Sequence, residues 1–263
     1  MTVQAAAAPI LSIEHVAVQF GGLTAISDMT FDVARGEFVS LIGPNGAGKT
    51  TAFNVITGFL RPTRGAVLFK GAALTGLKPH EVAALGLVRT FQRTSLFDKC
   101  SVFDNVLIGL HRRTKPSLLG ALLALPSERL KERELREKVW EILELVGLAD
   151  QARELGGSLP YGNQRLLGVA LALAADPEAL LLDEPVSGMN ASETGRFVEL
   201  IGKLRARDLT ILLVEHDMLM VMGISDRIVV LNYGKIIANG PPSAIQNDPE
   251  VIRAYLGQGV KHA

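Results

Sequence analysis

Cysteine is almost absent from this 263-residue chain, in which Cys100 is the only one. A single cysteine excludes an internal disulfide and is typical of a reducing compartment. An excess of charge is absent too, because 27 Lys and Arg residues balance 27 Asp and Glu residues. Proteins that bind nucleic acids usually carry a clustered basic excess, so we expect no nucleic-acid partner.

Long hydrophobic runs are also missing. The longest, such as SLLGALLALP at 117–126, are shorter than the ~20 residues that a bilayer requires. The opening residues MTVQAAAAPI have no Lys or Arg before their apolar stretch, so we expect no secretory signal. Nevertheless 48% of the residues are hydrophobic, which indicates that some surface is buried against partner proteins.

Strand patterns occur in two parts of the chain, separated by a helical stretch. Apolar runs bounded by turn residues predict strands at 11–20, 29–34, 38–42, 65–71, 179–183 and 210–215, and a hairpin over 227–240. From about 92 to 175 such patterns vanish. Within that stretch, residues 127–148 alternate charged and apolar residues at helical spacing. The sequence therefore predicts an α/β body interrupted by a mostly helical segment. In the helix over 127–148 we expect the inner side to carry Leu130, Leu135, Val139, Ile142 and Leu143.

The segment GPNGAGKT, from Gly43 to Thr50, fits the phosphate-binding pattern G-x-x-x-x-G-K-[ST]. It follows an apolar run typical of a buried strand and precedes a helical pattern, which is the context that such a loop requires. Glycines let successive N–H groups turn inward around an anion, and the helix start adds partial positive charge. We expect Lys49 to reach the β- and γ-phosphates, the Thr50 hydroxyl to bind Mg²⁺, and Thr51 to contact the α-phosphate. The expected phosphate contacts are therefore Gly43, Pro44, Asn45, Gly46, Ala47, Gly48, Lys49, Thr50 and Thr51.

Acidic and imidazole groups follow two other apolar runs. The segment ALLLDE ends in Asp183, which is suited to holding Mg²⁺ through water, and in Glu184, which is placed to accept a proton from an attacking water. Two adjacent acids at a buried strand end are costly unless they have a function. His216 follows the run ILLVE and is expected near the γ-phosphate.

Together these motifs resemble those of the ATP-binding-cassette (ABC) ATPase family, over nearly the whole chain. In chain order they are Phe20, GPNGAGKT, Gln92 in RTFQ, LPYGNQ at 159–164, LLLDE, SGMN at 187–190 and His216. The resemblance implies an α/β fold with a mixed sheet, an N-terminal antiparallel β subdomain and an inserted helical subdomain. It implies one domain over 1–263, with a core of about 1–91 and 176–263 and a helical subdomain of about 92–175.

The resemblance also implies roles for individual residues. Phe20 would stack on adenine. Gln92 would sense the γ-phosphate and bind Mg²⁺ or the attacking water. Glu184 would be the general base, and His216 would hold the γ-phosphate and water in line. Ser187 to Asn190 would form a loop that crosses to a second ATPase subunit. This chain's signature turn would contact the ATP that is bound to the second subunit. It would be formed by Leu159, Pro160, Tyr161, Gly162, Asn163 and Gln164, and Asn190 would contact the same ATP.

Finer features narrow the resemblance. The runs FGGLTAI, VRTFQ, PYGNQR, VEHDMLMVMGISDRI and DPEVIRAYLG are similar to those of ATP-binding subunits of branched-chain amino-acid importers, and related subunits for urea or other small polar solutes look similar. The implied partners are a second ATPase subunit, two transmembrane permease subunits and a solute-binding protein. The implied location is the cytoplasmic face of the cell membrane, held through protein contacts. A soluble ABC ATPase without a transport role is the distant alternative. An unrelated P-loop kinase or GTPase would not need Gln92, LPYGNQ and His216.

Several residues depart from the family pattern, in which the signature is most often LSGGQ. Tyr161 stands where Gly is usual and Asn163 where Gln is usual, although Tyr161 is common in the importer subgroup. Pro160 stands where Ser is usual, so it supplies neither a hydroxyl nor a backbone N–H to a phosphate. Leu171 replaces an Arg that is often seen. From Pro160 we expect the chain to work beside a different ATPase subunit, with the shared site that uses LPYGNQ being the weaker one.

Overall fold

The computed structural model describes residues 8–90, 96–111 and 126–256. The chain forms two compact units. The first comprises residues 1–89, 178–184 and 204–263, and the second comprises residues 90–177 and 185–203. The segment boundaries expected above, a core of about 1–91 and 176–263 around a helical segment of about 92–175, remain a prediction.

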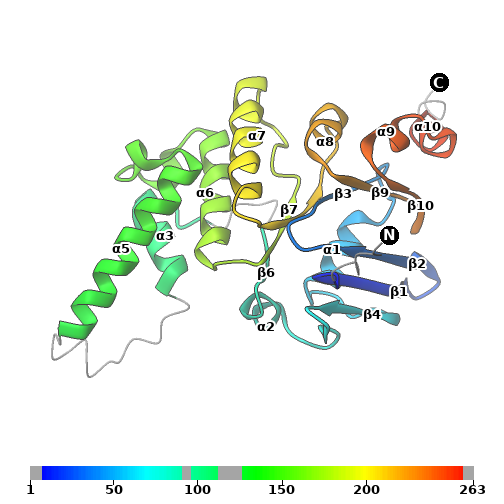
Figure 1. Cartoon of the computed structure of the whole chain (residues 1–263), viewed down its shortest axis with the longest axis horizontal. Helices are drawn as coiled ribbons and strands as arrows, with labels where there is room; N and C mark the ends of the chain where they lie inside the picture. Colours follow the sequence, from blue (N-terminus) through cyan, green and yellow to red (C-terminus); the bar gives the residue numbers. More distant parts are fainter. Residues whose placement is uncertain (1–7, 91–95, 112–125, 257–263) are drawn as a thin grey trace, which may run out of the picture. The chain divides into compact units, whose positions relative to one another are not determined.

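The first unit is built on one ten-stranded sheet in the order β5-β4-β1-β2-β10-β9-β3-β8-β7-β6 (Figure 1). Its strands are β1 (Leu11–Phe20), β2 (Leu23–Val33), β3 (Phe38–Ile42), β4 (Arg64–Phe69), β5 (Ala72–Ala73), β6 (Leu87–Arg89), β7 (Ala179–Asp183), β8 (Thr210–Val214), β9 (Arg227–Asn232) and β10 (Lys235–Gly240). Its helices are α1 (Lys49–Ile56), α2 (Pro79–Ala84), α8 (Met218–Ile224), α9 (Pro242–Gln246) and α10 (Pro249–Leu256).

Parallel and antiparallel pairing divide this sheet. Strands β9, β3, β8, β7 and β6 run parallel to one another, while β9 also pairs antiparallel with β10; β3, β7 and β8 are buried along their whole length. Strands buried on both faces read as continuous apolar runs, which is why FVSLI, ALLLD and TILLV were recognisable in the sequence. Strands β1, β2, β4 and β5 pair antiparallel, and one parallel pair, Lys235↔Asp28, joins them to β10. The expected α/β fold with an N-terminal antiparallel part is confirmed.

Some strands differ from the expectation. Strand β2 begins at Leu23, six residues before the predicted 29–34, because its outer end is exposed and lacks a continuous apolar run. The short strands β5 and β6 were not predicted, since two or three residues carry no readable periodicity. The expected hairpin over 227–240 is confirmed as β9 and β10.

In its described residues, the second unit consists of helices and turns with one isolated β-bridge. Its helices are α3 (Val102–His111), α5 (Pro126–Val146) and α6 (Tyr161–Ala174), with most of α7 (Ala191–Arg205) and two short 3₁₀ turns, Ala149–Gln151 and Gly156–Ser158. The predicted helix over 127–148 is confirmed as α5. Of its expected inner positions, Val139 and Leu143 are buried, whereas Leu130 is 55% exposed. The expectation for Leu130 is wrong because the buried side chains of α5, which packs against α3 and α6, begin at Val139.

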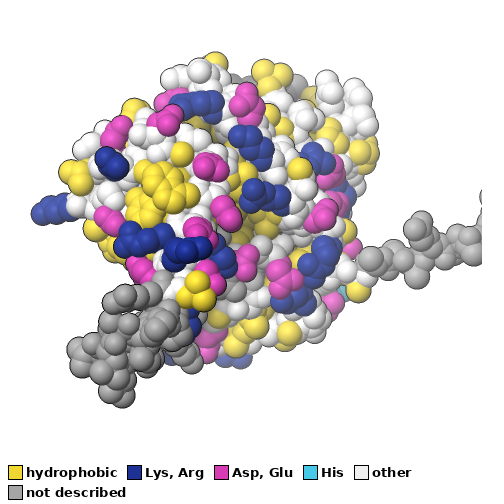
Figure 2. Space-filling view, turned by 60° about the vertical axis from the view of Figure 1, so that its left-hand side comes forward, with side chains coloured by type: hydrophobic (Ala, Val, Ile, Leu, Met, Phe, Trp, Pro, Cys, Tyr) yellow, Lys and Arg dark blue, Asp and Glu magenta, His cyan; other side chains and the backbone are white. Residues whose placement is uncertain are grey.

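Charges of both signs are interspersed over the face shown in Figure 2, as the zero net charge leads one to expect. Among the described residues, none of the helices combines the length and the apolar character needed to span a bilayer.

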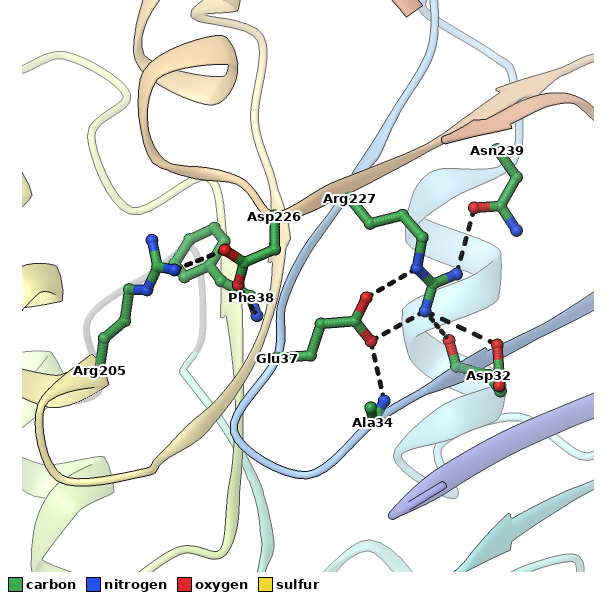
Figure 3. Close-up of polar contacts among 8 residues, drawn as sticks. All are labelled: Asp32, Ala34, Glu37, Phe38, Arg205, Asp226, Arg227 and Asn239. Carbon is green, nitrogen blue, oxygen red and sulfur yellow. Dashed lines mark hydrogen bonds and ion pairs between the residues drawn. The ribbon is translucent and has the colours of Figure 1, made fainter. Parts of the chain in front are cut away.

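A polar network connects the starts of β3, the strand that leads to the phosphate loop, and its neighbour β9 (Figure 3). Arg227, the first residue of β9, donates to both carboxylate oxygens of Glu37, at 2.7 and 2.9 Å, and to the Asp32 carbonyl at 2.7 Å. The Asp226 carboxylate accepts the Phe38 N–H at 2.9 Å. The starts of β3 and β9 are therefore tied together ahead of the loop.

Ionisation of Glu37 is coupled to this network. Burial raises the pKa of the Glu37 carboxyl, but the hydrogen bonds from Arg227 and from the Ala34 N–H lower it more, so that the net pKa lies below its ordinary value of 4.5. A carboxyl with a lowered folded-state pKa stabilises the fold above its unfolded pKa, and this stabilisation is lost as the pH falls through the folded pKa.

We predict that Glu37→Gln lowers the unfolding free energy by about 2 kcal/mol at pH 7, because it removes charge-assisted hydrogen bonds. The difference from wild type should shrink as the pH falls from 4.5, where the unfolded chain takes up the proton, through the lower pKa that Glu37 has in the folded protein. Urea titrations at pH 7 and pH 3.5 measure this, with Glu14→Gln at an exposed site as the control. An equal difference at both pH values would contradict the coupling.

Candidate nucleotide site

The phosphate loop joins β3 to α1, and two of its glycines allow close backbone approaches. A Cβ on Gly43 would lie 2.0 Å from the Leu231 carbonyl oxygen at the end of β9. Gly48 has φ +106°, and a Cβ there would lie 2.9 Å from the Ala25 carbonyl oxygen. Any other residue at Gly43 would force the loop away from β9. These positions explain why the motif requires glycine.

Lys49 lies inside the loop, and its side chain is held by the loop itself. Its ammonium donates to the carbonyls of Gly43 at 2.6 Å and Pro44 at 3.1 Å, and the residue is 7% exposed. Burial lowers the pKa of Lys49, and the nearby Glu184 carboxylate offsets part of this effect. The Gly48 cap of α1 has no side-chain hydrogen bond, so the first N–H groups of this helix can bind an anion.

Asp183 ends β7 and forms an ion pair within the first unit. Arg89, at the end of β6, donates to its carboxylate at 2.6 Å, and the two side chains are 8% and 9% exposed. Arg89 also donates to the Asn54 side chain on α1 at 2.8 Å. No local pattern indicated Arg89 as a site residue, because the three-residue strand β6 is too short to be recognised. Arg89 thus links the end of β7 to α1, the helix that follows the phosphate loop.

Glu184 and His216, which follow the neighbouring parallel strands β7 and β8, contact each other directly. The Glu184 carboxylate lies 2.6 Å from His216 Nε2. Glu184 has a positive φ of 47°, and its N–H donates to the Val214 carbonyl on β8 at 2.9 Å. Strained backbone of this kind clusters at functional sites. The geometry aims a carboxylate and an imidazole at one place.

One cavity of about 380 Å³ brings most of these groups together. Its lining includes residues 45–51 of the loop and first helix, with Glu184 and His216. A volume in this range suits a small-molecule ligand. The remaining lining residues are Leu23, Thr24, Ala25 and Tyr233.

Several expected site residues are not among those that line this cavity, including Gly43 and Pro44 of the loop. Phe20, at the end of β1, is 50% exposed and is not among the residues that line this cavity. Asp183, which precedes Glu184 in the chain, forms an ion pair with Arg89 and does not line the cavity either. Gln92 is outside the described residues.

The LPYGNQ segment opens α6 in the second unit. Pro160 is the cap residue of α6, with extended backbone and no side-chain cap. The Tyr161 hydroxyl donates to the Ser187 carbonyl at 3.1 Å, which connects the segment to SGMN. A Cβ on Gly162 would lie 2.5 Å from the Glu193 carboxylate, so a larger residue at this position would displace the Glu193 side chain.

The side chains that follow Gly162 are held within the same unit. Asn163 is buried and donates to Gln151 at 2.7 Å, while Gln164 donates to the Leu159 carbonyl at 2.9 Å. Asn190 caps α7 by accepting the Glu193 N–H at 3.0 Å. These contacts organise the turn. Contacts of the same residues with a second subunit's nucleotide remain a prediction.

Tyr255, on α10, is a further residue near the loop that the sequence did not single out. Burial raises the pKa of its hydroxyl to about 12, and a hydrogen bond from the Gly43 N–H offsets part of the rise. The run DPEVIRAYLG contains this residue, but its helical pattern gave no indication of a contact with Gly43.

We predict that Gly43→Ala abolishes nucleotide binding, because the added methyl group would collide with the Leu231 carbonyl. Gly71→Ala is the matched control, since Gly71 also has a positive φ of +77°, has nothing within 4 Å of an added Cβ and does not line the cavity. Its cost should be limited to about 1 kcal/mol of backbone strain. Calorimetric titration with ATP and thermal unfolding would distinguish the two variants. Equal binding by both would show that the approach to β9 is not a constraint.

Comparisons with known proteins agree with this arrangement. Residues 26–187 match the family model of the ABC transporter ATP-binding domain, and residues 235–261 match that of the branched-chain amino acid ATP-binding cassette transporter. The chain is 46% identical over 251 residues to the high-affinity branched-chain amino acid transport ATP-binding protein LivG of Escherichia coli, covering 95% of this chain and 98% of that protein. It is 44% identical to the corresponding protein BraF of Pseudomonas aeruginosa, with the same coverage.

A solved structure supports the same assignment. The ADP conformation of MJ1267, an ATP-binding cassette of an ABC transporter, superposes with a TM-score of 0.83 at 32% identity and covers 95% of this chain and 99% of that one. The chain belongs to the ABC transporter family and is one of its ATP-binding subunits, an ATPase whose activity is coupled to transport.

Proposed function

We propose that the chain hydrolyses ATP to energise the uptake of branched-chain amino acids. It would act at the cytoplasmic face of the cell membrane, with a second ATPase subunit, two permease subunits and a solute-binding protein. The similarity to LivG and BraF and the match of residues 235–261 support this choice of solute. The observation that carries the hydrolytic role is the Glu184–His216 pair in the same cavity as the phosphate loop.

The residues of the cavity fit a nucleoside triphosphate. The loop amides and the start of α1 would bind the phosphate oxygens, and Lys49 would exchange its bonds to the Gly43 and Pro44 carbonyls for bonds to phosphate. Thr50 lines the cavity, and its hydroxyl is of the type that binds Mg²⁺. A bound Mg²⁺ would neutralise charge on the phosphates, with Asp183 and Gln92 as further candidates for holding it.

Glu184 would remove a proton from the attacking water. A carboxylate must come within hydrogen-bond reach of that water, and the cavity position of Glu184 permits this. His216, held at 2.6 Å, orients the carboxylate and would share the hydrogen bond to the γ-phosphate. Glu184 combines a positive φ with a place in the cavity lining, and strained backbone of this kind clusters at functional sites.

The second unit would complete a site on another subunit. Residues 159–164 would contact that subunit's nucleotide, and Pro160 would leave one donor missing. Loss of one preorganised donor to a transition-state oxygen costs ~3 kcal/mol, on the order of a hundredfold in rate. The two shared sites of a mixed pair would then differ, with hydrolysis concentrated at this chain's own Glu184.

We predict that Glu184→Gln preserves ATP binding and lowers hydrolysis at least about a hundredfold, because the general base is lost. His216→Ala should also retain ATP binding and lower the rate of hydrolysis. His80→Ala, at an exposed position outside the cavity, should leave both binding and rate unchanged. Phosphate release over a series of protein concentrations measures both effects. Activity per chain that rises with concentration would show that the chain pairs with itself despite Pro160.

We predict that Pro160→Ser raises the ATPase rate of the assembled transporter by up to about twofold, because the weaker of two sites regains a donor. Pro241→Ser is the matched control, since Pro241 caps α9 in a similar extended conformation. Steady-state ATPase assays on the purified complex measure the change. An unchanged rate for Pro160→Ser would remove the argument for unequal sites.

Solute uptake provides a separate test of the transport assignment. Purification of the chain with its membrane partners, followed by competition between leucine and urea for uptake, would identify the solute. ATPase activity without any membrane partner would instead favour a soluble role.

A further inference from the structure

Tyr161, in the LPYGNQ segment, makes polar contacts within its own chain. Its hydroxyl donates to the Ser187 carbonyl at 3.1 Å and accepts a hydrogen bond from Arg165 Nε at 3.0 Å. The Arg165 guanidinium also lies 5.0 Å from the centre of the Tyr161 ring. The phenol is therefore held by two partners, although Tyr161 is 47% exposed. The Gly that is usual at this position in the family could make neither contact.

The Tyr161 ring also packs against the SGMN segment (residues 187–190) at Gly188. Gly188 has a positive φ of 82°, and a Cβ there would lie 3.0 Å from Tyr161 Cε1. A glycine at this position lets the backbone of the segment lie directly against the ring. Tyr161 thus fixes the segment at two successive residues, by a hydrogen bond to Ser187 and by a close contact with Gly188.

Two further contacts join the start of α6 to the segment that leads into α7. The Asn163 side chain accepts a hydrogen bond from Arg196 Nη1 on α7 at 3.2 Å. Gly162 approaches the Glu193 carboxylate, which accepts the Asn190 N–H at 2.9 Å. Three successive residues of LPYGNQ therefore contact residues 187–196, and all of these residues belong to the second unit.

We propose that Tyr161 is a positioning residue that joins the signature turn and the SGMN segment into one element, so that the two contacts of this chain with a second ATPase subunit form together. A loop held only at its ends loses backbone conformational entropy when pairing orders it. With the Tyr161 contacts in place, this order exists before the subunits meet, and less entropy is lost on association. The inference rests on the proposed pairing with a second ATPase subunit.

Replacement of Tyr161 by Phe tests the hydroxyl contact, because it keeps the ring. Hydrogen–deuterium exchange of the purified chain, resolved by residue, reports on the N–H groups of Met189 and Asn190, which are both hydrogen-bonded at 2.9 Å. We expect both to exchange about fivefold faster in Tyr161→Phe, the typical effect of losing one hydrogen bond. Amides in the second half of α6 should be unaffected. Tyr233→Phe is the matched control, since it alters an exposed tyrosine of the first unit.

The functional consequence is measured on the assembled transporter. For Tyr161→Phe we expect kcat for ATP hydrolysis to fall about fivefold, because the SGMN segment must then be ordered during pairing. Calorimetric titration of the isolated chain should give an unchanged Kd for ATP, since the phosphate loop and its cavity belong to other parts of the chain. The loss is thus confined to the step that brings two subunits together.

Packing of the ring on the segment is tested by a double-mutant cycle. Gly188→Ala should lower the midpoint of thermal unfolding more in the wild type than in Tyr161→Ala, because the added methyl group meets the ring only when Tyr161 is present. The strain of a positive φ is common to both backgrounds and cancels. An equal shift in the two backgrounds would contradict the contact.

The other outcomes are equally decisive. Unchanged exchange at Met189 and Asn190 would overturn the proposal, and so would faster exchange along the whole of α6, which would mean that Tyr161 only stabilises the unit. Faster exchange at the two amides with an unchanged kcat would show that order in the segment is not used in pairing. A wild-type transporter that does not hydrolyse ATP would instead show that the proposed function is wrong, while the exchange rates would still decide whether Tyr161 positions the segment.

Discussion

The nucleotide site depends on backbone segments that approach one another more closely than any side chain would allow. Gly43 lies against the carbonyl of Leu231, and both Gly48 and Gly234 lie against that of Ala25. These three approaches hold the phosphate loop between the end of β9 and the start of β2. The Arg227–Glu37 and Asp226–Phe38 contacts fix the other ends of β3 and β9, so the loop leaves a sheet that is restrained on both sides (Figure 3).

Much of this site could be predicted from the sequence because its signals are local. A glycine-rich loop after a buried strand is readable within eight residues, and the three buried strands are continuous apolar runs. Glu184 and His216 could each be placed after a strand, but their contact follows from the pairing of β7 with β8, which the structure shows. The fold class, the long helix α5 and the β9–β10 hairpin were predictable because their signals are local too.

The remainder depends on contacts between segments distant in sequence, which no local pattern encodes. Arg89 comes from a three-residue strand and is recognisable only by its contact with Asp183. The turn at Tyr233 and Gly234 carries no local signal of its contacts, because Gly234 bonds to Ala47 and Ser27, which are distant in sequence. Leu130 satisfied the helical spacing, but spacing does not reveal where the packing of α5 begins. Within the second unit, Asn163 and Gln164 likewise prove to be engaged by their own neighbours, which a motif comparison does not show.

The position of the Lys49 ammonium has a consequence for the thermodynamics of ligand capture. The Gly43 and Pro44 carbonyls already accept hydrogen bonds from the Lys49 ammonium. Binding of a phosphate therefore replaces existing hydrogen bonds and adds few new ones. The enthalpy gained at this lysine is thus a difference between two sets of partners. In return, the side chain is ordered before the ligand arrives, and little rotamer entropy is lost on binding. Affinity at this position should therefore reflect preorganisation more than the strength of any single charge–charge contact.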